Sequence, residues 1–107
     1  MDLRDLTPDE DAVLLGFLDE VVSSDGEYSD SERAHTTRLE TAIGKERVAA
    51  AIADVNRRFP SRGPLEMAAK GVSRPEAREA IYKFLEKIAA KTDPSLVWLA
   101  TTWSITR

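Results

Sequence analysis

The sequence predicts an all-α fold: a compact bundle of about five to six helices in one domain spanning residues 1–107. Three observations predict this fold class. Apolar residues recur at helical spacing in several segments, residues typical of helix starts precede these segments, and most prolines and glycines fall between them. No segment has the sustained alternation of a β-strand, and the Asp25–Gly26 pair is flanked by helical rather than strand periodicity.

The first half of the chain contains three predicted helices. The first begins at residues 7–10, a capping box with a proline in its first turn. Its apolar face contains Leu14, Phe17, Leu18 and Val21. The second begins with another capping box at residues 29–32 and ends at Gly44. The third stops before Pro60, and the residues aligned on its apolar side are Val48, Ile52, Val55 and Phe59.

The second half contains a predicted turn at residues 62–64, Arg-Gly-Pro, and then a short helix over residues 65–70. A capping box from Ser73 to Glu76 is expected to start the next helix. The core face of that helix contains Ala77, Ile81, Phe84, Leu85 and Ile88. Residues 92–94 start a last helix that is apolar nearly all round, which predicts burial or a contact surface.

Residues 17–22 and 84–89 resemble each other, and each segment is followed by a small or polar pair and then an aspartate, Asp25 or Asp93. One interpretation is a pair of pseudo-repeated helical hairpins. The other is that two amphipathic helices with similar ends look alike without being related. The residues alone leave both interpretations open.

Composition argues against an enzyme. The chain has no cysteine, which excludes disulfides, thiolate metal sites and a cysteine nucleophile and fits a reducing compartment. With one histidine, no catalytic triad can be assembled, and no glycine-rich phosphate loop is present. His35 follows Glu32 at the Glu-x-x-His spacing of di-iron proteins, but such sites need two such pairs. His35 is therefore expected to be a hydrogen-bonded packing residue.

The N-terminal residues are acidic and lack the apolar run of a secretion signal, and charges interrupt every stretch that could span a bilayer. We therefore expect a cytoplasmic protein.

The net charge of −4 is divided unevenly along the chain. Residues 1–43 carry −9 and residues 44–107 carry +5. This asymmetry indicates a partner for one half, pairing between the halves, or two solvated faces that happen to differ. Arginines cluster at Arg57, Arg58 and Arg62, with further cations at Lys45, Arg47 and Arg74. A nucleic-acid-binding regulator would use such a patch, but the chain is acidic and has no recognition motif, so nucleic acid is not the expected partner.

The segment between the first two predicted helices is the most informative for function. Calcium and magnesium prefer several carboxylate and carbonyl oxygens that converge on one point. A bend at Gly26 can bring together Asp25, Glu27 and Glu32, which are the predicted ligands of a divalent cation. Their spacing matches the second half of an EF-hand loop, but Val21 and Ser23 stand where the first acidic ligands belong.

The same segment has an interpretation without a metal. Gly26 ends one helix and the box from Ser29 to Glu32 begins the next, which accounts for most of the residues. This interpretation leaves Asp25 and Glu27 without a role.

Residues 17–44 resemble the TerB-like family of tellurite-resistance proteins, whose signature is an apolar helix, then Asp-Gly, then a glutamate seven positions after the aspartate. Residues 65–93 resemble the stretch that leads to the family's second copy of this signature. The resemblance implies a compact bundle of helix pairs and a divalent cation held by acidic loops, with Asp25 and Glu32 matching the motif acids. It also implies a non-catalytic binding module that acts in a stress-response context. The implied partner is a protein, for example one that belongs to a membrane-associated complex.

This chain departs from the family in its second half. Asp93 is followed by Pro94 instead of glycine, and Ala100 occupies the position of the matching glutamate. A site built from two loops is therefore incomplete here, which implies either weaker cation binding than in a relative with both loops or a vestigial site.

The last helix offers a second contact surface. Trp98 and Trp103 are five residues apart and cannot share one narrow stripe, so either one is exposed as an anchor for a partner or both pack inside. Formation of a homo-oligomer through this helix is a further expectation.

Overall fold

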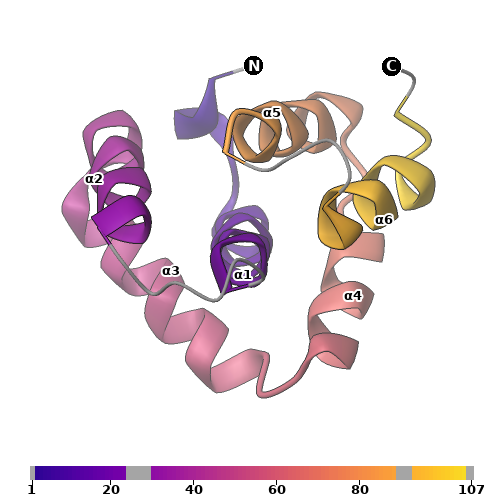
Figure 1. The fold of residues 1–107 in the computed structure, drawn as a ribbon, viewed down its shortest axis with the longest axis horizontal. Helices are drawn as coiled ribbons and strands as arrows, with labels where there is room; N and C mark the ends of the chain where they lie inside the picture. The colour runs from indigo at the N-terminus through magenta and orange to yellow at the C-terminus, as the bar shows by residue number, and fades with distance from the viewer. Residues whose placement is uncertain (1, 24–29, 89–92, 106–107) are drawn as a thin grey trace.

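The computed structural model describes the backbone of residues 2–23, 30–88 and 93–105; the side chains of residues 22–33 lie outside that description. Within these ranges the chain forms only helices, so the all-α prediction is confirmed (Figure 1). The elements are a short 3-10 helix η1 (Leu3–Asp5) and six α-helices: α1 (Pro8–Ser23), α2 (Asp30–Ile43), α3 (Lys45–Arg58), α4 (Arg62–Lys70), α5 (Pro75–Glu86) and α6 (Pro94–Thr102). None of the described helices is long and apolar enough to cross a bilayer.

Helix α1 runs through the middle of the molecule, and α3, α4, α5 and α6 all contact it (Figure 1). Every residue from 10 to 18 is buried. A helix that is buried on all sides packs closely against its neighbours, and Gly16 allows one neighbouring helix to come close. A methyl group at Gly16 would lie 2.6 Å from Cδ1 of Leu65, so the glycine allows α4 to approach α1 closely.

The start of α1 follows the predicted capping box. The backbone amide of Thr7 donates to Oε1 of Glu10 at 2.8 Å, and the amide of Glu10 donates to Oγ1 of Thr7 at 3.2 Å. These two bonds satisfy amide groups that a helix start otherwise leaves without partners. The predicted apolar face is also confirmed, since its residues are buried: Leu14, Phe17, Leu18 and Val21.

Helix α4 begins earlier than the sequence predicted. The predicted turn at residues 62–64 is wrong, because Arg62, Gly63 and Pro64 form the first turn of the helix, which continues to Lys70. A proline is tolerated there because the first amides of a helix have no partner within it, so the missing N–H of Pro64 costs no hydrogen bond.

The predicted capping box at Ser73 is also wrong. Helix α5 starts at Pro75 with Arg74 in the capping position, and no side chain caps it. Pro75 lacks the N–H of the first helical position and has the φ angle of a helix, which reduces the need for a cap. The predicted core face of α5 is confirmed where Ala77, Ile81, Phe84 and Leu85 are buried, and Ile88 is half-buried.

Helix α6 is capped by Asp93, whose Oδ1 accepts from the amides of Ser95 at 2.8 Å and Leu96 at 3.3 Å. Trp103 follows the helix and is buried, with its indole N–H donating to the carbonyl oxygen of Ala69 at 2.9 Å. The Cα radius of gyration is 12.6 Å, as expected for a compact globule of this length.

Candidate partner-binding groove

The predicted cation site lies mostly outside the described residues. Helix α1 ends at Ser23 and α2 begins at Asp30. Asp25 and Glu27 fall between them, outside the described residues, and Glu32 lies in α2 with a side chain that is also outside the description. The cation at these three residues therefore stays a prediction. Elsewhere, the described residues hold no group of three or more acidic or histidine side chains able to bind a metal.

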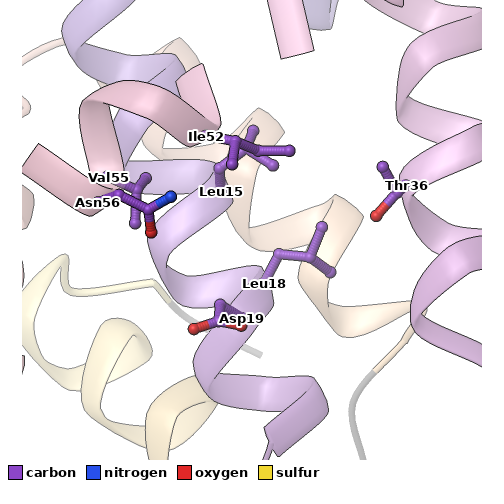
Figure 2. A pocket seen from close by; sticks show the side chains of 7 residues that line it. All are labelled: Leu15, Leu18, Asp19, Thr36, Ile52, Val55 and Asn56. Carbon is purple, nitrogen blue, oxygen red and sulfur yellow. The ribbon is translucent and has the colours of Figure 1, made fainter. Parts of the chain in front are cut away.

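A groove lies between α1, α2 and α3 on the surface of the described chain (Figure 2). Its pocket has a volume of about 210 Å³. Figure 2 shows Leu18 and Ile52 pointing into the space in front of α2, with Thr36 on the opposite side. The lining residues are Leu15, Leu18, Asp19, Thr36, Ile52, Val55 and Asn56.

The apolar wall of the groove arises because α3 has more apolar residues than its neighbours cover. Val48 and Ala51 of α3 are buried, but Ile52 keeps 41% of its surface exposed. The sequence placed Ile52 on the same apolar side as Val48 without distinguishing their burial. Isolated exposed aliphatic residues are common, but Ile52 shares its pocket with the buried Leu15 and Leu18. With Val55 these side chains form the apolar wall of the groove, and Asp19, Thr36 and Asn56 supply the polar part of its lining.

Helix α2 forms the far wall, and contacts of its C-terminal half hold it in place. Leu39 is fully buried, and Nε of Arg4 donates to the carbonyl oxygen of Ala42 at 2.9 Å. Gly44 then turns the chain with a φ of +101°, a conformation that favours glycine. These contacts hold α2 against η1 and α3. Among the side chains of α2 that the structure describes, Thr36 lines the groove.

His35, next to Thr36 on α2, differs from the sequence expectation. It is half-buried, and its Nδ1 atom is buried without a hydrogen-bond partner in the described chain. The prediction that His35 is a hydrogen-bonded packing residue is therefore wrong for its Nδ1 atom.

Charge pairing along α1 distinguishes the groove from the rest of the helix. Four of the five acidic residues of α1 pair with arginines from later in the chain. The pairs are Asp9–Arg58 at 2.9 Å, Glu10–Arg74 at 3.0 Å, Asp11–Arg47 at 2.6 Å and Glu20–Arg62 at 3.5 Å. The fifth, Asp19, is exposed, lines the groove, and has no ion pair within the described ranges.

Two of these pairs organise the N-terminal segment. Besides Asp11, the Arg47 guanidinium donates to the carbonyl oxygen of Arg4 at 2.7 Å and to that of Leu6. Arg74 donates to the carbonyl oxygen of Asp5 at 3.0 Å as well as to Glu10. The sequence did not predict these roles. The two residues of each ion pair are 36 or 64 positions apart in the sequence, so the pairs leave no local pattern.

The electrostatic environments of Glu10 and Asp11 differ although the residues are adjacent. The hydrogen bond from Arg74 holds the pKa of Glu10 below its ordinary value. Burial raises the pKa of Asp11 and outweighs the opposing effect of Arg47. Neither acid lines the groove.

The arginines that the sequence offered to nucleic acid also have acidic partners. Arg57 pairs with Asp54 at 2.5 Å, and Arg62 lies 3.1 Å from Glu66. Arg62 also lies over the ring of Phe17 at 5.2 Å and that of Trp98 at 5.8 Å. Such neutralised and stacked cations are less available to phosphates than free ones.

Both tryptophans pack against the protein. Trp98 is half-buried and stacks on Phe17, with ring centroids 5.8 Å apart, while Trp103 is buried. The apolar side chain that α6 does expose is Val97. Self-association through this helix stays a prediction.

A second, larger hollow contains four charged side chains. It has a volume of about 420 Å³ and lies beside the start of α1 and the connection between α4 and α5. Its charged residues are the paired Asp9, Arg58, Glu10 and Arg74. Because these groups already satisfy one another, this hollow offers a ligand less than the groove does.

Comparison with protein-family models, with curated proteins and with solved structures finds no match to this chain. The resemblance to the TerB-like family therefore stays a prediction from the residues quoted above.

Proposed function

We propose that this chain is a non-catalytic binding module whose groove between α1, α2 and α3 takes an apolar side chain of a protein partner. One observation carries the proposal: Ile52 is 41% exposed and lies in a pocket walled by Leu15 and Leu18. Burial of such a wall by a partner is favourable, because it removes apolar surface from water.

The size of the pocket supports a protein partner over a metabolite. Pockets that enclose small-molecule ligands usually have volumes of about 300–1,000 Å³. The groove pocket, at about 210 Å³, is smaller and suits one large apolar side chain. Partner segments commonly insert single apolar or aromatic residues into such pockets, and these residues carry much of the binding energy.

The proposal includes the finer expectations from the sequence. The module is of the TerB-like kind, acts in a stress-response context, and binds a divalent cation at Asp25, Glu27 and Glu32. The similarity between residues 17–22 and 84–89 supports two related helical hairpins. The support for these points is the sequence pattern, whereas the support for the groove is its geometry.

The test is selection of peptides from a random library displayed on phage, followed by affinity measurement with purified variants. Ile52→Glu puts a charge on the apolar wall at a half-exposed position that tolerates it in the fold. Met67→Glu is the matched control, because Met67 is 75% exposed and does not line the groove. We expect selected peptides to bind the wild type and Met67→Glu alike, and to bind Ile52→Glu at least about tenfold more weakly. Failure to enrich any peptide, or enrichment of peptides indifferent to Ile52→Glu, would contradict the proposal.

A further inference from the structure

Residues 2–6, which include η1, are held to the helices by arginine side chains. We infer that this segment is a strap that detaches as a unit while the α-helices stay folded, and that its detachment uncovers apolar surface beside α3. Three observations support this inference: the hydrogen bonds of the strap, its burial, and the hollow that it borders. None of them involves the groove.

The strap makes its backbone hydrogen bonds within itself. In the described ranges, the amide of Asp5 donates to the carbonyl oxygen of Asp2 at 3.0 Å, and the amide of Leu6 donates to that of Leu3 at 3.3 Å. No backbone hydrogen bond joins residues 2–6 to another element within those ranges. The strap can therefore leave without breaking any hydrogen bond of a neighbouring helix.

The hydrogen bonds that join the strap to other elements all come from guanidinium groups. Arg4 donates to the carbonyl oxygen of Ala42 in α2, and Arg47 and Arg74 donate to carbonyl oxygens of the strap. Most of these bonds are exposed to solvent, so water can replace the partners that detachment removes. Helix α2 also contacts α3, so its position does not depend on the strap alone.

The ion pairs of α1 do not need the strap. Arg47 binds both oxygens of the Asp11 carboxylate, and Arg74 binds both oxygens of the Glu10 carboxylate. These four side chains all belong to residues outside the strap. When the strap leaves, each arginine keeps its charged partner and loses only its bonds to the strap. Detachment therefore does not leave a buried charge without its partner, which would be the larger cost.

Burial attaches the strap to the core through two leucines. Leu6 is buried and Leu3 is half-buried, whereas Asp2, Arg4 and Asp5 are exposed. Segments with few buried apolar side chains and with exposed hydrogen bonds open at a lower free energy than the packed helices of the same protein. The strap has both properties, so we expect it to open well before the molecule unfolds.

The surface that the strap covers lies against α3. Leu6 and Ala51 both line a small hollow with a volume of about 210 Å³, and Ala51 is buried. The remaining lining residues are Pro8, Asp11, Arg47, Ala50 and Asp54. Detachment withdraws Leu6 from one side of this hollow and opens its alanine side to solvent. The strap thus controls access to an apolar surface of the α1–α3 pair.

The absence of cysteine from the sequence allows a direct test of opening. A thiol introduced by Leu6→Cys is buried while the strap is attached, and iodoacetamide labels it only when it is exposed. Leu85→Cys, at a fully buried position of α5, is the matched control. The open fraction from labelling is compared with the unfolded fraction of the same variant from urea denaturation. We expect the open fraction of Leu6→Cys to exceed its unfolded fraction at least about tenfold, and the two fractions of Leu85→Cys to agree.

Removal of one guanidinium bond tests how the strap is attached. Arg4→Ala removes the bond to Ala42 and should raise the open fraction of Leu6→Cys about fivefold, with the labelling of Leu85→Cys unchanged. Arg38→Ala removes an exposed arginine from α2 instead and should change neither. An open fraction that is the same with Arg4→Ala and Arg38→Ala would overturn the role of the guanidinium groups.

Hydrogen exchange of the unmodified chain tests opening without a cysteine variant. Relative to their intrinsic rates, the amide of Leu6 should exchange at least about tenfold faster than that of Leu14 inside α1. Its exchange should also depend less on low concentrations of urea, because opening of the strap exposes little surface. Equal protection of the two amides, or labelling of Leu6→Cys only to the extent of its unfolded fraction, would overturn the inference.

Discussion

Nε of Arg47 lies 2.6 Å from Oδ2 of Asp11, and this ion pair joins the first turn of α3 to the first turn of α1. The carboxylate is almost completely buried, with 3% of its side chain exposed. The same guanidinium donates to backbone carbonyls of Arg4 and Leu6. One arginine thus holds η1, α1 and α3 together.

Arg47→Ala is expected to destabilise the fold strongly. The substitution leaves a buried carboxylate without its partner and two carbonyl groups without a donor, which typically costs about 3 kcal/mol. Urea denaturation followed by circular dichroism measures the change in the free energy of unfolding. Arg57→Ala is the control, because Arg57 is 75% exposed in its pair with Asp54 and should cost less than about 1 kcal/mol. Equal losses in the two variants would contradict the structural role of Arg47.

Stability is expected to depend on pH through Glu10. The pKa of Glu10 is lowered in the fold from its ordinary value of 4.5, so the unfolded chain binds this proton more readily. The resulting stabilisation is present above pH 4.5 and is lost as the pH falls through the folded pKa. Urea denaturation between about pH 2.5 and 7 should show a shallower acid loss for Glu10→Gln than for the wild type, together with lower stability at neutral pH. Parallel curves would show that Arg74 does not favour the charged form.

Two glycine substitutions should have opposite effects. Gly44→Ala forces a side chain onto a φ of +101°, with no atom within 4 Å of the new methyl group, so its cost of about 1 kcal/mol is conformational. Gly63 also has open space around it but lies in α4, where alanine is the better helix former. Gly63→Ala should stabilise by up to about 1 kcal/mol. Thermal denaturation measures both, and a stabilising Gly44→Ala would show that the turn between α2 and α3 is not as described.

Cation binding at the acidic segment is testable without reference to the groove. Isothermal titration with calcium and magnesium should give a binding signal in the wild type that Asp25→Ala removes, because loss of a carboxylate ligand weakens a site for hard cations. Glu46→Ala, which removes an exposed acid from α3, is the control for overall charge. No heat in the wild type, or the same heat after Asp25→Ala, would retire the site at Asp25, Glu27 and Glu32.

Local sequence patterns predicted the helices well where a single signal decides the outcome. The capping box at Thr7 and Glu10, the cap at Asp93 and the buried face of α5 all depend on residues within a few positions of one another. The errors at residues 62–64 and at Ser73 arose where proline is compatible with both a turn and a first helical turn.

The candidate groove could not be predicted in the same way. Periodicity places Val48 and Ile52 of α3 on one apolar side, but only the packing of α1 and α2 decides that the first is buried and the second is left on an open wall. The pairing of Arg47 and Arg74 with α1, and the lack of such a pair at Asp19 within the described ranges, likewise depend on contacts far apart in the sequence.

By itself, the sequence determined that the chain folds into helices, where most of them start, and which residues form the greater part of the core. Helical hydrogen bonds and caps are local, so they leave patterns that can be recognised within a few residues. The tertiary structure decided which apolar residues stay uncovered and which charges are neutralised. Those outcomes depend on how the helices pack against one another, and segments distant in the sequence supply the partners.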